Sequence, residues 1–105
     1  MNRKKHLYGV LLTGMLAMSG TTFAATPTAS MLANTCAGCH GPKGVSHGES
    51  PSIAGVPKHI IIKKMKGFKK GRAANTIMTR IAKGYTDKEI ELIAGFYAQQ
   101  KPAKQ

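Results

Sequence analysis

The chain has 105 residues, of which sixteen are Lys or Arg and only four are Asp or Glu, so its formal net charge is +12. A chain this short forms one small domain, which excludes a multidomain architecture. It has no tryptophan and only six other aromatic residues, so few large side chains can fill a core. Domains of this size often depend on a disulfide, a metal or a cofactor for stability.

The first 24 residues have the pattern of a secretory signal peptide. A basic start precedes an uncharged apolar run from Leu7 to Met18, and small residues follow, with Thr22 and Ala24 at the positions that a signal peptidase reads. The apolar run is too short for a transmembrane helix, so a retained anchor is the less favoured alternative. We expect cleavage near Ala24. Residues 1–24 would then be the signal peptide and residues 25–105 one periplasmic domain that does not span the membrane.

Helical patterns and loops follow, and no strand-like alternation persists, which predicts an all-α fold. The first helix is expected to begin with Thr26 as its N-cap and Pro27 at its first position, and to run through residues 30–34 into the cysteine motif. Residues 41–55 contain four glycines and two prolines, which is a loop composition.

The next helix is expected to begin at Pro57 and to end near Gly67 or Gly71. Its periodicity places Ile61, Met65 and Phe68 on one side and lysines on the other. Asn75 is expected to cap a short helix over residues 76–83, which Gly84 ends.

The last predicted helix carries the clearest signal. Thr86 and Glu89 have the spacing of a capping box, in which each side chain bonds the backbone amide of the other residue. Apolar residues then recur at helical spacing at Ile90, Ile93, Ala94 and Tyr97, and Pro102 lies beyond the helix.

Both cysteines of the chain lie in the segment TCAGCHG, residues 35–41. A thioredoxin-like dithiol belongs to a strand-helix-strand unit, and a disulfide across so small a loop would constrain the unfolded chain little. Zinc would need His47 and His59 as further ligands, but these are twelve residues apart rather than three to five. Both histidines have polar or glycine-rich neighbours and are expected to be exposed.

Cys-x-x-Cys-His is, by contrast, the pattern that attaches haem c. The thiols of Cys36 and Cys39 would add to the two haem vinyl groups as thioethers, and His40 would be an axial ligand of the iron. The haem would also supply apolar volume that the sequence lacks. We therefore expect one covalent haem c.

These motifs resemble those of the small class I cytochromes c, and more closely those of the haem subunit of flavocytochrome c sulfide dehydrogenase. The resemblance rests on CAGCHGPKGVSHGESPSIAG, residues 36–55, and TIMTRIAKGYTDKEIELIAGFYA, residues 76–98. These segments cover just over half of the chain that follows the signal peptide. The resemblance implies a small class I cytochrome c fold, with N- and C-terminal helices packed around one haem and joined by long loops.

The resemblance also implies a second axial ligand. Related proteins carry it in the segment matching NTIMTRIAKGY, so Met78 is the expected ligand, with Met65 as the alternative and Met31 expected in the core. They also use a proline carbonyl to hold the Nδ1 proton of the ligand histidine, which implies that role for Pro51. The alternatives are a packing methionine at position 78 and an ordinary loop proline at position 51.

With both axial positions occupied, the iron can only accept and pass one electron, so no catalysis by the chain itself is expected. The resemblance implies a subunit that receives electrons from the FAD-containing flavoprotein subunit of sulfide dehydrogenase. The alternatives are a free soluble carrier that serves an oxidase or reductase, and a haem sensor with a labile distal ligand.

Seven basic residues lie between positions 58 and 72 with no acid among them. Nucleic acid is not expected as the partner of an exported chain, whereas an acidic docking face on a redox protein or an anionic membrane surface is. The alternative is a merely solvated helix face. The candidate docking residues are Lys58, Lys63, Lys64, Lys66, Lys69, Lys70 and Arg72.

Overall fold

The computed structural model describes residues 20, 25–73 and 76–104. These residues form helices and loops with no strand, so the predicted all-α class is confirmed for them. The expected signal peptide, apart from Gly20, and the expected cap Asn75 lie outside the described residues. The helices are α1 (Ala29–Asn34), α2 (Ala37–His40), the 3₁₀ turn η1 (Pro42–Gly44), α3 (Lys58–Lys69), α4 (Met78–Ala82) and α5 (Asp87–Ala98).

The capping box of α5 is confirmed. The Glu89 amide donates to the Thr86 hydroxyl at 3.2 Å, and the Thr86 amide donates to the Glu89 carboxylate at 2.8 Å. Because both bonds satisfy amides that lack helical partners, they fix where α5 begins.

The first helix differs from the prediction at both ends. Its N-cap is Thr28, not Thr26, because the Thr28 side chain accepts from the Met31 amide at 3.3 Å. The helix also does not run on into the cysteine motif. The Thr35 hydroxyl and amide both donate to the Leu32 carbonyl, and the Cys36 amide donates to that of Ala33. These i→i−3 bonds tighten the chain and separate α1 from α2.

Helix α4 is shorter than the helix expected over residues 76–83. The Met78 amide donates to the Thr76 hydroxyl at 3.0 Å, which satisfies one amide at the start of α4. The Gly84 amide donates to the Ile81 carbonyl at 3.0 Å in a turn that ends the helix. The α3 boundaries agree with the prediction, since Pro57 is its N-cap.

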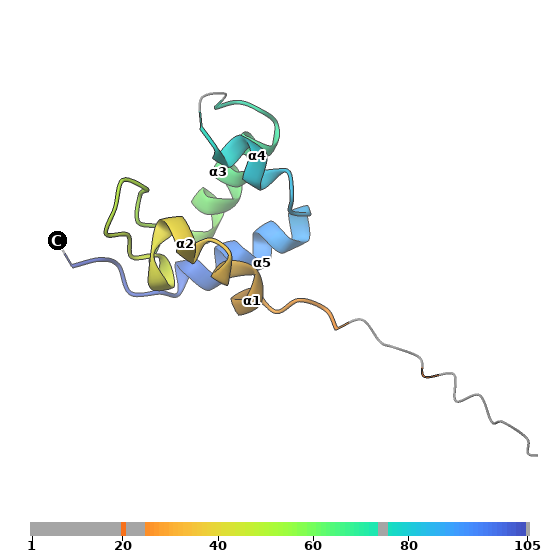
Figure 1. Ribbon diagram of the computed structural model, residues 1–105, viewed down its shortest axis with the longest axis horizontal. Coiled ribbons are helices and arrows are strands. Elements are labelled where there is room, and N and C mark those ends of the chain that lie inside the picture. Colours follow the sequence, from red (N-terminus) through yellow and green to blue (C-terminus); the bar gives the residue numbers. More distant parts are fainter. Residues whose placement is uncertain (1–19, 21–24, 74–75, 105) are drawn as a thin grey trace, which may run out of the picture.

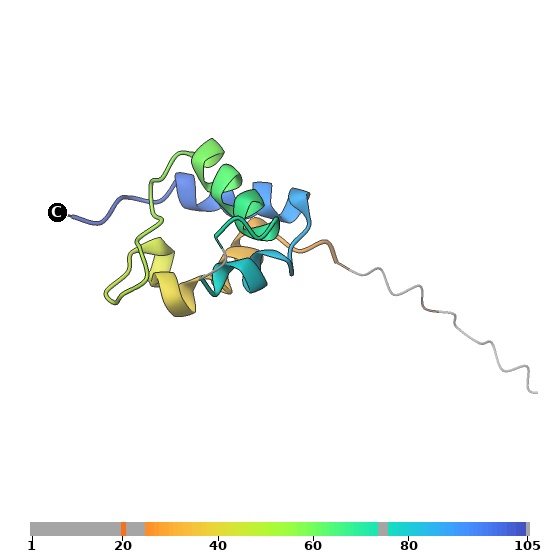
Figure 2. The same ribbon diagram turned by 90° about the horizontal axis from the view of Figure 1, so that it is seen from above.

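The core lies where α1 and α3 pack against α5, while α4 packs on α3 (Figures 1 and 2). All four periodic apolar residues of α5 are buried, and they meet Ile61 and Met65 of α3 and Ala33 of α1. At the contact between α1 and α5, the Tyr97 hydroxyl donates to the buried Ala33 carbonyl at 2.6 Å. The Ala33 carbonyl also accepts from the Cys36 amide, so the bond from Tyr97 is its second, and it ties the end of α1 to α5.

Within residues 25–73 and 76–104, no helix combines the length and the apolar character needed to cross a bilayer.

Candidate haem-binding site

The cysteine motif begins where α1 ends. Cys36 is the N-cap of α2, and Cys39 and His40 form the end of that helix. Cys36 is half-buried and Cys39 is exposed, and both are free thiols. One short helix therefore presents two thiols and an imidazole within five residues.

His40 is held in a defined tautomer by the loop that follows it. Its Nδ1 lies 2.6 Å from the Pro51 carbonyl oxygen. A carbonyl only accepts hydrogen bonds, so Nδ1 carries a proton, and in the neutral imidazole Nε2 is then the nitrogen with a free lone pair. This is the state of a histidine that ligates a metal through Nε2, so the imidazole fits the axial role.

The loop reaches back to His40 because glycines turn it sharply. Gly41 has φ +82°, and a Cβ there would lie 1.8 Å from the Val45 carbonyl oxygen. The Gly44 carbonyl accepts from the amides of Ile53 and Ala54, at 2.8 and 3.1 Å, which closes the loop. These bonds bring Pro51 beside the histidine eleven residues earlier. Only glycine tolerates the left-handed conformation and the close approach at position 41.

The three methionines lie in different surroundings. Met65 is 6% exposed within the core, as its place on the apolar side of α3 predicts. Met78 begins α4 and packs against the core while remaining half-buried. Met31 is 65% exposed, so its expected place in the core is wrong. It projects away because Ala33, two residues later, faces α5 instead.

The remaining apolar residues around the core leave surface that a flat apolar group can cover. Nine of them pack against the buried cluster while staying partly exposed, which suits a porphyrin better than an ion. They are Leu32, Cys36, Ile53, Val56, Ile62, Phe68, Met78, Tyr85 and Phe96.

The electrostatics around Cys36 disfavour a thiolate. Burial raises the pKa of the Cys36 thiol, and hydrogen bonding with Thr35 and Tyr97 offsets this only in part. A redox-active dithiol needs a lowered thiol pKa, so this environment does not fit thioredoxin-like chemistry. Burial, with smaller contributions from Cys36 and Tyr85, raises the pKa of Tyr97 to about 12.

A zinc site finds no support. Among the residues that the structure describes, no three His, Cys, Asp or Glu side chains converge. His47 and His59 are both exposed, as expected.

The basic segment of α3 is partly neutralised by α5. The Asp87 carboxylate forms ion pairs with Lys69 Nζ at 3.3 Å and with Lys66 Nζ at 3.4 Å. The Lys69 hydrogen bond and then the Lys66 charge lower the pKa of Asp87 below its usual value. The sequence places Asp87 at the start of the last helix and gave no sign that it would meet these lysines.

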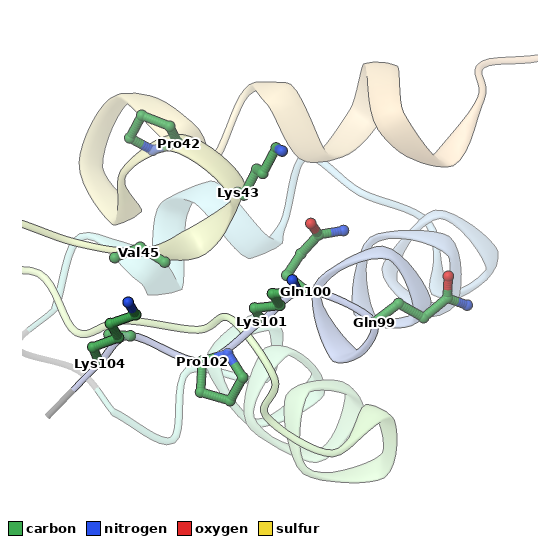
Figure 3. A pocket seen from close by; sticks show the side chains of 9 residues that line it. Pro42, Lys43, Val45, Gln99, Gln100, Lys101, Pro102 and Lys104 are labelled. Atoms are coloured by element: carbon green, nitrogen blue, oxygen red, sulfur yellow. The ribbon is translucent and has the colours of Figure 1, made fainter.

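A second basic surface lies at the C-terminal tail, apart from the cysteine motif. A hollow of about 550 Å³ separates η1 from residues 99–104, and its lining includes Lys43, Lys101 and Lys104 (Figure 3). None of Cys36, Cys39 and His40 lines it.

A helical chain with the haem-attachment motif and a histidine fixed by a loop carbonyl defines a c-type cytochrome, and the comparisons agree. The chain belongs to the class I cytochromes c, proteins that carry covalent haem c and transfer electrons. It is 38% identical over 96 residues to the cytochrome subunit of sulfide dehydrogenase from Chlorobaculum tepidum, covering 79% of this chain and 87% of that protein.

Two cytochromes c4 are also similar. That of Pseudomonas aeruginosa is 32% identical over 92% of this chain and 49% of its own length. That of Thiocapsa roseopersicina is 41% identical over 62% of this chain and 34% of its own length. The chain thus spans half or less of these two relatives. No family profile matches the chain.

Proposed function

We propose that the chain is a periplasmic one-electron carrier that receives electrons from the FAD-containing flavoprotein subunit of a sulfide dehydrogenase. The observation that carries this proposal is the match to a sulfide dehydrogenase cytochrome subunit along 87% of that protein. A match along most of a single-domain subunit supports the same role more strongly than a match to part of a longer cytochrome.

Within this proposal each residue of the site has one task. Cys36 and Cys39 would form the thioethers to the haem, and Nε2 of His40 would ligate its iron. Pro51 fixes the imidazole through the 2.6 Å bond to Nδ1. Met78 would be the second ligand, because it is half-buried at the start of α4 whereas Met65 is buried in the core. Bound haem supplies one-electron exchange at iron, and His/Met ligation favours the reduced state.

Docking is proposed to use the part of the basic segment, residues 58–72, that Asp87 does not neutralise. Lys66 and Lys69 are engaged by Asp87, so they are less available to a partner than the sequence suggested. The other basic residues of the segment are exposed and suit an acidic face on the flavoprotein. They are Lys58, Lys63, Lys64, Lys70 and Arg72.

Export is proposed from the leader pattern of residues 1–24. The test is the N-terminal sequence of the protein recovered from the periplasm of its host. A first residue at or near Ala25 supports cleavage, whereas an intact Met1 start would contradict it.

The test of the partner is purification of the haem protein from its native host, followed by flavin analysis. A co-eluting flavoprotein is expected, and adding sulfide without oxygen should reduce the haem only when both proteins are present. If the haem protein instead eluted without a flavoprotein, and no flavoprotein fraction with sulfide reduced its haem, the chain would be a free carrier. Carbon monoxide should not bind the reduced protein; firm binding would favour a sensor with a labile ligand.

A further inference from the structure

Tyr85 connects two segments that lie fifty residues apart. It is half-buried in the turn between α4 and α5, and its hydroxyl lies 2.5 Å from the Thr35 hydroxyl at the end of α1. The Thr35 hydroxyl donates to the Leu32 carbonyl at 2.7 Å. A hydroxyl has one proton to donate, so Tyr85 is the donor in its bond with Thr35.

The backbone of Tyr85 is held from a different direction. Lys69 Nζ donates to the Tyr85 carbonyl at 2.7 Å and also pairs with Asp87 Oδ1 at 3.3 Å. These contacts tie residues 85–87 to the last turn of α3. The phenol is therefore the part of this turn that reaches across to the junction of α1 and α2.

This connection lies between the two proposed ligand segments. Thr35 directly precedes Cys36. On the other side, Met78 is the first residue of α4, seven residues before Tyr85, and α4 packs on α3. Among the described residues, no other side-chain hydrogen bond joins residues 25–56 to residues 76–86. The Tyr85–Thr35 bond is therefore the side-chain hydrogen bond that resists movement of residues 76–86 away from the cysteine motif.

We infer that Tyr85 is a positioning residue. Its hydrogen bond to Thr35 holds the segment carrying Met78 in place relative to the segment carrying His40, and so limits how readily another ligand displaces Met78. The inference rests on the proposed ligation by Met78. It gives this tyrosine a task that packing alone does not require, since the ring would still pack without its hydroxyl.

The test compares variants of the haem-loaded protein. Oxidised protein is titrated with imidazole, and loss of the sulfur-to-iron absorption band near the red end of the spectrum is followed. Tyr85→Phe should lower the apparent Kd for imidazole about threefold to tenfold, as expected for one lost hydrogen bond. Thr35→Val should lower the Kd at least as much, because it also removes the bond to the Leu32 carbonyl. Adding Tyr85→Phe to Thr35→Val should change the Kd little, because the bond that the two residues share is already gone. Thr35→Ser keeps the hydroxyl and should retain the original Kd.

Tyr97→Phe is the matched control, because it removes a different phenol hydroxyl, the one that bonds the Ala33 carbonyl between α1 and α5. It should lower resistance to urea and leave the imidazole Kd unchanged. An unchanged Kd in Tyr85→Phe, or an equal change in Tyr97→Phe, would overturn the inference. If the band instead persisted in Met78→Ala, the ligand assignment itself would be wrong, so the two failures are distinguishable.

Discussion

Met65 and Met78 offer the same thioether in different surroundings, and this difference makes them separable. Met78→Ala should abolish the sulfur-to-iron band of the oxidised protein, since the proposed ligand is gone. Met65→Ala should keep the band but lower the free energy of unfolding by about 2–5 kcal/mol, because it leaves a cavity in the buried cluster. Absorption spectra and urea titrations check both. A band lost only in Met65→Ala would reverse the assignment.

Tyr97 gives the protein a dependence on alkaline pH. Its pKa is raised to about 12, chiefly by burial, so the folded protein holds the phenol proton more tightly than the unfolded chain does. The resulting stability is fully present below pH 10 and is lost as the pH rises from 10 to 12. The loss should be on the order of 1–2 kcal/mol.

Urea titrations between pH 9 and pH 12 check this dependence. Tyr97→Phe has no phenol proton, so its stability should fall less over the same range. Equal slopes in the two proteins would show that other groups, such as the lysines, cause the loss.

At the scale of elements, the start of α5 depends on two reciprocal bonds. Thr86→Ala removes the side chain that accepts from the Glu89 amide, and it should lower the free energy of unfolding by about 1 kcal/mol. Glu89→Gln keeps an acceptor for the Thr86 amide and should cost less, because glutamine serves in the same box. Urea unfolding of the two variants decides. Equal losses would mean that charge at this helix end matters more than the cap.

The elements that the sequence predicted well are those with local signals. The capping box of α5 and the helical spacing of its four apolar residues both involve neighbours along the chain, and the structure contains both. The sequence did not predict the break between α1 and α2. There the Thr35 side chain donates to the Leu32 carbonyl, and the spacing of apolar residues carries no information about such a side-chain bond. The pairing of Asp87 with α3 and of Tyr85 with Thr35 depends on tertiary packing, so no spacing in the sequence announces either.

The candidate site divides in the same way. Cys36, Cys39 and His40 follow from a compact motif, and the contact between His40 and Pro51 was expected from family resemblance. The glycine turns that make this contact possible are visible as loop composition, but not as a specific path. The role of Met78 as an iron ligand stays a prediction. Its half-buried position distinguishes it from the buried Met65, but does not show what its sulfur binds.

The basic face of α3 supports a prediction about association. Lys63→Glu with Lys64→Glu should slow reduction by the flavoprotein about tenfold at low ionic strength, because an attractive face becomes repulsive. The difference should shrink as salt is added, since these side chains are exposed. Stopped-flow mixing with the reduced flavoprotein measures the rate.

The tail lysines provide the control for this experiment. Lys101→Glu with Lys104→Glu makes the same change in net charge on exposed residues of the hollow beside η1. A much smaller effect is expected there. If both pairs slowed the reaction equally, net charge rather than the α3 face would govern the encounter.

For the whole molecule, the described core is small for a domain that must stay folded. Nine apolar residues are buried, and four of them are alanines, namely Ala33, Ala54, Ala82 and Ala94. Alanine removes little apolar surface from water, so the hydrophobic contribution per buried residue is low. The half-buried residues around this core can bury more surface only against another apolar body, and covalent haem provides one.

This dependence makes the haem-free chain a test of the entire arrangement. The double variant Cys36→Ala, Cys39→Ala removes both attachment points, so the chain should lose cooperative unfolding and near-ultraviolet circular dichroism while keeping partial helix content. Met78→Ala keeps the tether and is the control: its urea transition should stay cooperative at a lower midpoint. The expected contrast follows because the tether, unlike one axial bond, keeps the apolar body within the fold. A cooperative transition in the double variant with the slope of the haem protein would mean that the nine buried residues suffice alone.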